Sequence, residues 1–286
     1  MQGVVYVNGT ITSADAAVVP VFDHGFLYGE GIYETLRTYR HVPFLFSEHM
    51  ARLRRSAELI ALPVPFTDAE LRAEIDRTCA ACEVADTDDL YIRMLLTRGV
   101  GDLTYNLGAT PVPSLIIIVK PLKPFPERNY TEGIRVALVD VRRNHTSALN
   151  PMIKSNNLLN NALAMQEAYR RGADEALMLN QAGQVTECSQ SNVFIVKDGA
   201  LATPPLSAGL LPGITRQFVL DLAWKIGVPA GERHVTAQDV AGADEVFITG
   251  TTREITPVTR IDDAPVGEGT PGPVTLQLLA AFRART

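Results

Sequence analysis

The chain has 286 residues, of which 46% are hydrophobic and 20% charged, and its formal net charge is −6. This composition is ordinary for a globular protein and supplies enough apolar side chains for two cores. The acidic balance, without a long basic run, argues against nucleic acid as a partner. No apolar stretch approaches the roughly 20 residues that cross a bilayer, and no signal-like segment follows Met1, so we expect a cytoplasmic protein.

The first 120 residues have the pattern of an α+β unit. Asn8-Gly9 stands between two alternating runs and predicts a β-hairpin, and Thr35–Tyr39 with Val42–Phe46 predicts a second one. Two helices and then two strands are expected beyond them, at Ser47–Leu62, Asp68–Val84, Tyr91–Arg98 and Ser114–Lys120. Ser47 and Thr67 are the expected N-caps, because their hydroxyls can accept a hydrogen bond from the first helical turn.

A stiff connector is predicted where three prolines fall within residues 121–126. We therefore divide the chain into a small N-terminal domain at 1–120, a connector at 121–133 and a larger domain at 134–286. The larger domain alternates strands with helices. Strands are expected at Ile134–Val141, Glu175–Asn180, around Val185, Val193–Lys197 and Glu245–Thr249, and helices at Ser155–Arg171 and Thr215–Ile226.

Cysteine and histidine spacing gives no strong metal signal. Cys79 and Cys82 form a C-x-x-C pair, but a zinc site requires two further ligands, and no strand leads into the pair as in thioredoxin-type motifs. We interpret both as small buried side chains and expect no metal. His24 and His49 show no ligand spacing, and we expect structural roles for them.

Lys154 carries the central hypothesis. It stands between the apolar Met152-Ile153 and the amide-rich Ser155-Asn156-Asn157, at the start of the helix predicted for Ser155–Arg171. Desolvation disfavours the ammonium form, and a neutral amine can attack a carbonyl to form a Schiff base. That is the chemistry of pyridoxal phosphate enzymes. The alternative is an ordinary surface lysine in a first helical turn.

Four further features suit the same cofactor. Glu187 can pair with a protonated pyridine nitrogen, or it is only a turn residue. Leu211–Arg216 opens a helix with proline and glycine, which is typical of a phosphate site and also of a plain helix start. Thr249–Val258 offers hydroxyls and amides after a strand, as ordinary turns also do. Arg52 is a phosphate candidate or part of a solvated basic helix face.

Together these segments resemble the class IV aminotransferases, the fold-type IV pyridoxal phosphate family, from Val4 to about Phe282. The matching motifs are Phe22–Gly31, Glu48–Ser56, Tyr91–Arg93, Ile153–Ser155, Thr186-Glu187, Pro212–Arg216 and Gly250–Pro257. Within the family the chain looks most like branched-chain amino-acid aminotransferases, on Arg98–Leu103 and Gly267–Gly269. The resemblance implies an α+β fold with a smaller N-terminal α/β domain and a larger C-terminal pseudo-barrel domain. It also implies pyridoxal 5'-phosphate between the domains and at least a homodimer.

The resemblance also implies roles for individual residues. Lys154 would form the Schiff base and later move the proton, and Glu187 would hold the pyridine nitrogen. The other cofactor-binding residues would be Arg52, Leu211, Ile214, Thr215, Thr251 and Thr252, with Leu211 packing on the ring. The substrate residues would be Tyr28, Tyr33, Thr35, Tyr91 and Arg93, with the amides of Thr251 and Thr252 receiving the α-carboxylate. Leu103 and Tyr105 lie in a loop that reaches across a dimer interface in relatives.

Three departures keep the substrate open. Leu158 stands where branched-chain enzymes have a tyrosine, Tyr33-Glu34-Thr35 replaces Phe-Glu-Gly, and Cys188–Asn192 replaces a glycine-rich stretch. The leucine and the Ser-x-Ser-Asn pattern look more like D-amino-acid aminotransferases, whereas Tyr91-Ile92-Arg93 looks like the L-specific branch. We predict transamination between a branched-chain L-amino acid and 2-oxoglutarate. The alternatives are a D-amino-acid or (R)-amine transaminase, an aminodeoxychorismate lyase, or a non-enzymatic cofactor-binding protein.

Overall fold

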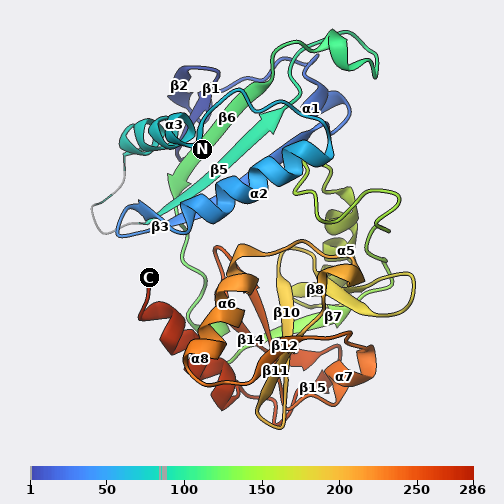
Figure 1. Cartoon of the computed structure of the whole chain (residues 1–286). Helices are drawn as coiled ribbons and strands as arrows, with labels where there is room; N and C mark the ends of the chain where they lie inside the picture. The colour runs from blue at the N-terminus through green and yellow to red at the C-terminus, as the bar shows by residue number, and fades with distance from the viewer. Residues whose placement is uncertain (1, 84, 86–88) are drawn as a thin grey trace. The chain divides into compact units, whose positions relative to one another are not determined.

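The computed structural model describes residues 2–83, 85 and 89–286, and the chain folds into two units (Figure 1). Unit 1 comprises Met1–Pro124 together with Ile153–Asn157, and unit 2 comprises Phe125–Met152 and Leu158–Thr286. The first change of unit falls inside the predicted connector 121–133. The short return of Ile153–Asn157 to unit 1 was not expected, because the sequence analysis assigned Lys154 to the larger domain.

Unit 1 is built on a six-stranded antiparallel sheet with the order β2-β1-β6-β5-β3-β4. Its strands are β1 Val4–Val7, β2 Thr10–Ser13, β3 Gly31–Tyr39, β4 Val42–Pro43, β5 Leu90–Thr97 and β6 Ser114–Pro121. The hairpin at Asn8-Gly9 is confirmed, and both residues have positive φ, as a tight hairpin turn requires. The second predicted hairpin also forms, but β4 ends at Pro43 and Phe46 already belongs to a helix.

The helices of unit 1 are α1 His24–Leu27, α2 Phe46–Leu59 and α3 Asp68–Ala80, with a 3-10 turn η1 at Leu107–Ala109. Leucine and isoleucine side chains of α2 and α3, such as Leu53 and Ile75, pack with Leu36 and Met94 of the sheet into one core. Each fully buried side chain of this size contributes roughly 1.5–3 kcal/mol, and this burial joins the helices to the sheet.

The two predicted N-caps differ in outcome. Thr67 caps α3 and forms a reciprocal capping box with Glu70, as predicted. Ser47 is not a cap, because α2 begins one residue earlier, after Leu45 in the left-handed conformation, and this end has no side-chain cap. Helix α3 ends at Ala80, whereas the prediction extended it to Val84, which lies outside the described residues.

Unit 2 contains a nine-stranded mixed sheet with the order β12-β11-β10-β13-β14-β7-β8-β9, and β15 pairs with β14. The strands are β7 Ile134–Leu138, β8 Glu175–Leu179, β9 Val185–Cys188, β10 Asn192–Lys197, β11 Ala200–Thr203, β12 Ala230–Glu232, β13 Glu245–Gly250, β14 Glu254–Ile261 and β15 Ala264–Pro265. The sheet curls into a half-barrel, which is the predicted pseudo-barrel (Figure 1). The mixed α/β fold predicted from the resemblance is therefore confirmed.

Helices cover this sheet at α4 Arg128–Thr131, α5 Leu159–Arg170, α6 Ile214–Lys225, α7 Ala237–Ala241 and α8 Pro273–Arg283, with a 3-10 turn η2 at Leu206–Ala208. Helix α5 joins the parallel strands β7 and β8, and alanines such as Ala164, Ala168 and Ala176 let it pack closely on them. Helix α4 lies within the predicted extended connector. Among the described residues, we find no helix with the length and apolarity needed to cross a membrane.

The helix predicted for Ser155–Arg171 begins only at Leu159, so Lys154 is not in a helical turn. Residues 153–157 instead run along the outer edge of β3 as an added strand-like segment. The Tyr33 amide donates to the Lys154 carbonyl at 2.9 Å, and the Asn156 amide donates to the Gly31 carbonyl at 2.8 Å. The expectation that Lys154 opens a helix is therefore wrong.

Candidate active site

The backbone of Lys154 is held by hydrogen bonds at both its carbonyl and its amide. Its carbonyl accepts from Tyr33, and its amide donates to the Ser56 hydroxyl of α2 at 3.1 Å. The side-chain Nζ lies 4.5 Å from the centre of the Tyr33 ring. An ammonium over an aromatic face is attracted by the ring quadrupole, which orients the side chain. The half-buried amine of Lys154 is therefore held in a defined place beside β3.

The predicted substrate residues of β3 and β5 share one face of the sheet in unit 1. Successive side chains alternate between faces, so Tyr33 and Thr35 point away from the core that receives Leu36. Thr35 pairs with Arg93 across the two strands, and the Arg93 guanidinium lies 4.0 Å from the Tyr33 ring centre. The Lys154 amine and the Arg93 guanidinium thus both lie against the phenol ring of Tyr33.

Of the two remaining predicted substrate residues of unit 1, Tyr91 lies on the same face as Tyr33 and Arg93, whereas Tyr28 lies in another part of the unit. Tyr91 pairs with Arg37 and lies on the same face, two residues before Arg93. Tyr28 lies after α1, with its ring 4.9 Å from that of His24 and 5.1 Å from that of Tyr105. Tyr28 therefore belongs to a second aromatic group, which includes the loop that carries Tyr105.

Arg52 is buried, which excludes the alternative of a solvated basic face. Its Nε and Nη2 donate to the two carboxylate oxygens of Glu34 at 2.8 and 2.7 Å, and His49 Nδ1 lies 2.7 Å from Glu34 Oε2. Burial alone would raise the pKa of Glu34, but the charge and hydrogen bonds of Arg52, together with His49, lower it to about 2. Burial lowers the pKa of His49. The fork of Arg52 is therefore locked in one plane.

Glu187 lies in unit 2, in strand β9, with only 5% of its surface exposed, so it is not a turn residue. Its Oε1 accepts from Arg143 Nε at 2.8 Å. Its Oε2 accepts from the Leu211 amide at 3.1 Å and from Asn192 Nδ2 at 3.4 Å. These contacts hold both oxygens of the carboxylate in place. In its ionised form, Glu187 would be the partner that a protonated pyridine nitrogen needs.

The predicted phosphate turn forms the start of α6. Gly213 is the N-cap residue with extended backbone, and no described side chain caps this end of the helix. A Cβ at Gly213 would lie 1.8 Å from Asn192 Oδ1, so the close approach requires glycine. Asn192 Nδ2 also donates to the Leu211 carbonyl at 3.1 Å. Asn192 therefore joins Glu187 to the turn that opens α6, where helix N–H groups favour an anion.

The second predicted turn, at Thr251–Arg253, joins β13 to β14 in unit 2. Thr249 pairs with Asn192 across β13 and β10, which brings this turn beside the first one. The hydroxyls of Thr249 and Ser191 are buried and have no hydrogen-bond partner within the described chain. Unpaired buried hydroxyls are costly, and an oxygen-rich ligand would satisfy them. These residues fit a cofactor that carries a phosphate.

Several residues of the site have no signal in the sequence. Arg253 Nη1 pairs at 2.6 Å with Glu175, which is fully buried and also accepts from the Ser189 amide. This pair anchors the Thr251–Arg253 turn to the start of β8. Glu34 and Arg143 were likewise missed as partners of Arg52 and Glu187. Each pair joins residues far apart in the chain, so local spacing cannot reveal it.

The environment of the cysteines favours the thiol over the thiolate. All three thiols are free, and Cys82 and Cys188 are buried. Burial raises the pKa of Cys79 to about 12 and also raises that of Cys82. The interpretation of Cys82 as a small buried side chain is confirmed, whereas Cys79 is only partly buried. Over the described ranges, no cluster of three or more His, Cys, Asp or Glu residues could hold a metal.

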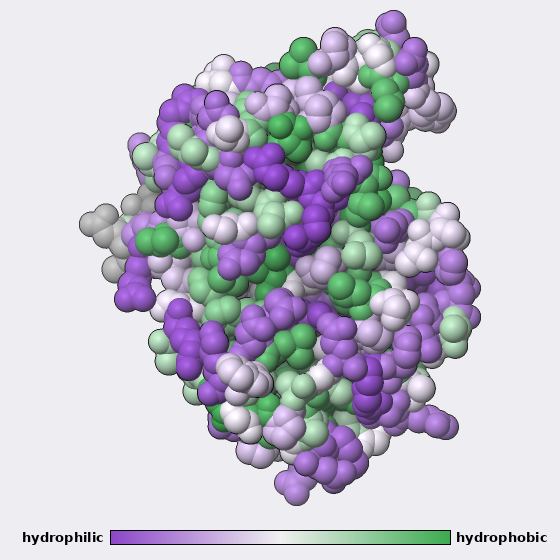
Figure 2. Space-filling view, viewed as in Figure 1, coloured by the Kyte–Doolittle hydropathy of each residue, from purple (hydrophilic) through white to green (hydrophobic). Residues whose placement is uncertain are grey.

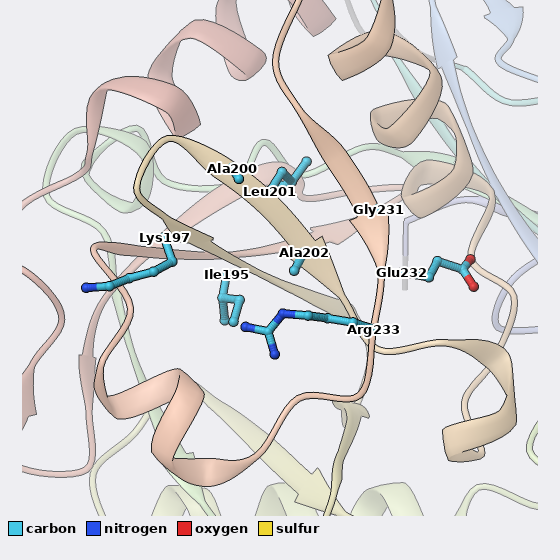
Figure 3. Close-up of a pocket in the computed structure, with 8 residues that line it drawn as sticks. All are labelled: Ile195, Lys197, Ala200, Leu201, Ala202, Gly231, Glu232 and Arg233. Carbon is cyan, nitrogen blue, oxygen red and sulfur yellow. The ribbon is translucent and has the colours of Figure 1, made fainter.

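A hollow of about 240 Å³ lies elsewhere on unit 2, over β10, β11 and β12, and contains none of the predicted site residues (Figure 3). Figure 3 shows Arg233 lying across it, whereas Lys197 and Glu232 point away. Lys197 pairs with Asp244, Glu232 with Arg216 and Arg233 with Asp239. Because its charged side chains already have partners, we do not assign this hollow to the site.

Comparisons with known proteins place the chain in one family. Residues 31–261 match the family model described as amino-transferase class IV. A protein of Methanocaldococcus jannaschii, named provisionally as a branched-chain-amino-acid aminotransferase, is 40% identical over 98% of this chain and 95% of its own length. A D-alanine aminotransferase of Listeria monocytogenes is 39% identical over 97% of this chain and 94% of its own.

Solved structures agree with this assignment. The branched-chain amino acid aminotransferase of Escherichia coli has a TM-score of 0.94 and 32% identity over 99% of this chain and 94% of that one. The branched-chain enzyme of T.th., complexed with N-(5'-phosphopyridoxyl)-L-glutamate, has a TM-score of 0.89 and 30% identity over 99% and 93%. The chain is an aminotransferase and belongs to the class IV family.

Proposed function

We propose that this aminotransferase uses pyridoxal 5'-phosphate to exchange the amino group between a branched-chain L-amino acid and 2-oxoglutarate. The observation that carries the proposal is the group formed by Lys154, Tyr33 and Arg93, in which an amine and a guanidinium share one aromatic ring. The amine supplies the cofactor linkage, and the ring and guanidinium offer an apolar and a charged surface to two kinds of substrate.

Most of the residues that we assign to the cofactor lie in unit 2. Glu187 pairs with the ring nitrogen, and Leu211 packs on the ring. Ile214 and Thr215 at the start of α6, with Thr251 and Thr252, bind the phosphate, and Arg52 supplies a guanidinium to it. The T.th. enzyme, which was solved with a phosphopyridoxyl ligand, supports this choice of cofactor. When bound, such a cofactor accepts the electron pair that a substrate carbon leaves on losing its proton.

Lys154 performs two tasks in this proposal. Its amine would hold the cofactor through the aldehyde carbon, and once a substrate amine had taken that place, the freed Nζ would act as the base that takes the proton from the substrate carbon. The backbone pairing with Tyr33 keeps the amine in reach through both tasks. In the second half-reaction, Nζ would give a proton to the carbon of the 2-oxo acid that receives the amino group, so both substrates would use the same amine.

Arg93 is assigned to the side-chain carboxylate of glutamate. A charge that leaves water requires a partner, and a guanidinium binds a carboxylate with two parallel hydrogen bonds. Tyr28, Tyr33 and Thr35 form the apolar and hydroxyl-bearing wall for a branched side chain. Tyr91 and the amides of Thr251 and Thr252 receive the α-carboxylate that both substrates share.

The test is a set of half-reactions on the purified protein with pyridoxal phosphate. Each L- and D-amino acid is added alone, and the cofactor absorbance is followed. We expect L-leucine, L-isoleucine, L-valine and L-glutamate to convert the cofactor to its amine form, and Lys154→Ala to show no conversion. Conversion by D-alanine alone would contradict the substrate assignment, and no conversion by any amino acid would contradict transamination.

A D-amino-acid transaminase is the second candidate. Leu158 and the Ser189-x-Ser191-Asn192 segment favour it, and the Listeria D-alanine aminotransferase is almost as similar to this chain as the Methanocaldococcus protein. Asn192 contacts both Glu187 and the Leu211 turn, so the departure from a glycine-rich stretch lies inside the candidate site. The half-reaction panel separates the two candidates directly.

We also propose a homodimer. Unit 1 exposes large apolar side chains on two joined segments, namely Val18, Val21, Phe22, Phe26, Val100, Leu103, Tyr105, Leu107 and Val112. The Gly101 amide donates to the Phe22 carbonyl at 3.2 Å, which holds the two segments side by side. On the face of the protein shown in Figure 2, hydrophobic residues lie among hydrophilic ones. A monomer rarely exposes such a surface, and a second copy would bury it. Light scattering should give twice the mass of one chain, and Phe26→Asp should reduce it.

The cytoplasm is the proposed compartment, because all three cysteines are free and a reducing compartment keeps them so.

A further inference from the structure

Arg143 is a buried arginine that the sequence analysis did not single out. It follows β7 in unit 2 and has 8% of its surface exposed. Its Nε donates to Glu187 Oε1 at 2.8 Å, and its Nη1 donates to Asn160 Oδ1 at 3.1 Å. A buried arginine costs desolvation, so its placement against a buried carboxylate requires an explanation.

The segment that carries Arg143 is rigidly held. The Arg143 amide donates to the Leu179 carbonyl at 2.9 Å, which ties the segment to the end of β8. Asn160, the second residue of α5, donates to the Arg142 carbonyl at 2.8 Å and accepts from the Asn144 amide at 3.3 Å. The guanidinium is therefore aimed at Glu187 by contacts on its backbone and on its far nitrogen.

The same carboxylate receives donors from three separate segments. Arg143 binds one oxygen, and the Leu211 amide and Asn192 bind the other. Of these three donors, Arg143 is the one that brings a positive charge, and a charge-assisted hydrogen bond is about twice as strong as a neutral one. Among these three donors, Arg143 therefore contributes most to keeping Glu187 ionised and in one orientation.

We propose that Arg143 is a positioning residue that sets the ionisation and direction of Glu187, and thereby the strength with which the site holds a protonated ring nitrogen. This inference rests on the proposed function, in which Glu187 faces the nitrogen of the cofactor. A neutral residue at 143 would leave Glu187 free to take up a proton or to turn away. The site would then lose its preference for a ring that carries nitrogen.

The experiment measures that preference directly. Apoenzymes of the wild type, Arg143→Gln, Arg143→Lys and Arg142→Gln are titrated with pyridoxal phosphate and with its 1-deaza analogue, in which a C–H replaces the ring nitrogen. The measured quantity is the ratio of the two dissociation constants. Arg142 is exposed and adjacent, so Arg142→Gln is the control for loss of one positive charge.

We expect the wild type and Arg142→Gln to prefer pyridoxal phosphate by about tenfold or more, which corresponds to one charge-assisted hydrogen bond. Arg143→Gln should reduce the ratio to below about threefold, because most of that bond is lost. A merely structural arginine would weaken both cofactors equally and leave the ratio unchanged. An unchanged ratio in Arg143→Gln overturns the proposal.

Arg143→Lys serves if Arg143→Gln does not fold. Lysine keeps the charge but cannot reach Glu187 and Asn160 with a planar fork, so an intermediate ratio is expected. If Arg143→Gln is unfolded, a wild-type ratio in Arg143→Lys overturns the claim that the planar fork of Arg143 sets the direction of Glu187. Different results would contradict the proposed function and the role of Arg143. Absence of covalent cofactor in the wild type contradicts the proposed function, whereas a bound cofactor with no preference in the wild type contradicts the role of Glu187 and with it this inference.

Discussion

The two units each bury a glutamate against an arginine, and the two pairs differ in the donors that complete them. In unit 1, both oxygens of Glu34 are bound by the fork of Arg52, and His49 lies against one of them. In unit 2, Glu187 accepts from Arg143 Nε, from the Leu211 amide and from the Asn192 side-chain amide. Glu34 is fully buried, whereas Glu187 keeps 5% of its surface exposed.

The two carboxylates therefore have different roles. A carboxylate bound on both oxygens by one guanidinium has little capacity for another cation, and it fixes the arginine instead. Glu187 instead accepts from three separate segments, which hold the carboxylate itself in place. We therefore interpret Glu34 as the residue that orients Arg52, and Glu187 as the residue that meets a ligand.

The largest expected effect is on stability, in Glu34→Gln. Removing one member of a buried ion pair leaves the other charge unpaired and costs about 3–5 kcal/mol. Urea denaturation should show this loss, while Glu58→Gln on the exposed face of α2 should change the free energy of unfolding by less than about 0.5 kcal/mol. Equal stability of the two variants would show that the Glu34 pair does not hold unit 1 together.

The pH dependence of stability should follow the same carboxylate. The pKa of Glu34 is lowered from 4.5 to about 2, so the unfolded chain takes up the proton first as the pH falls. The stabilisation is complete above pH 4.5, is lost progressively as the pH falls toward 2, and amounts to roughly 3 kcal/mol. The difference in unfolding free energy between wild type and Glu34→Gln should therefore shrink from about pH 6 to about pH 3. A constant difference over that range would contradict the pairing.

Glu187→Gln should reduce the rate of the half-reaction strongly and the free energy of unfolding only slightly. We expect the rate of the half-reaction to fall by about 100-fold, because the neutral amide stabilises a protonated ring nitrogen far less. Stability should fall less than in Glu34→Gln, because Arg143 keeps its bond to Asn160. Stopped-flow absorbance and urea denaturation measure the two quantities on one preparation. A stable variant with the wild-type rate would remove Glu187 from the site.

Arg93→Met should have the smallest effect on activity, and this effect should fall on one substrate and not on the other. We expect kcat/KM for L-glutamate to fall by about tenfold relative to that for L-leucine, because a carboxylate loses its partner while an apolar side chain does not. Arg37→Met, on the same face of β3 and paired with Asp89, is the control and should leave the ratio unchanged. Equal losses for both substrates would assign Arg93 to the shared α-carboxylate or to the fold.

The elements of the fold that sequence predicted well are those with local signals. The Asn8-Gly9 hairpin, the Thr67 cap and the start of α6 each depend on residues within a few positions of one another. The start of α2 was missed because it depends on the left-handed backbone of Leu45, which no side-chain pattern marks. Strands β11, β12 and β14 and helix α8 were not predicted.

The site shows the same limit. Glu187, Leu211 and the Thr251 turn could be proposed from motifs, but the residue that joins them, Asn192, acts through contacts across β10 and β13. Lys154 was singled out by its neighbours, yet its backbone is fixed by Tyr33, far earlier in the chain. Contacts between residues that are far apart in the chain produce no local sequence pattern from which they could be predicted.

The most direct test is chemical trapping of the Lys154 amine. The purified protein is incubated with pyridoxal phosphate, reduced with borohydride, digested and mapped by mass spectrometry. We expect a reduced pyridoxyl label on Lys154 and on no other lysine. A label at another lysine, or none on the folded protein, would contradict it.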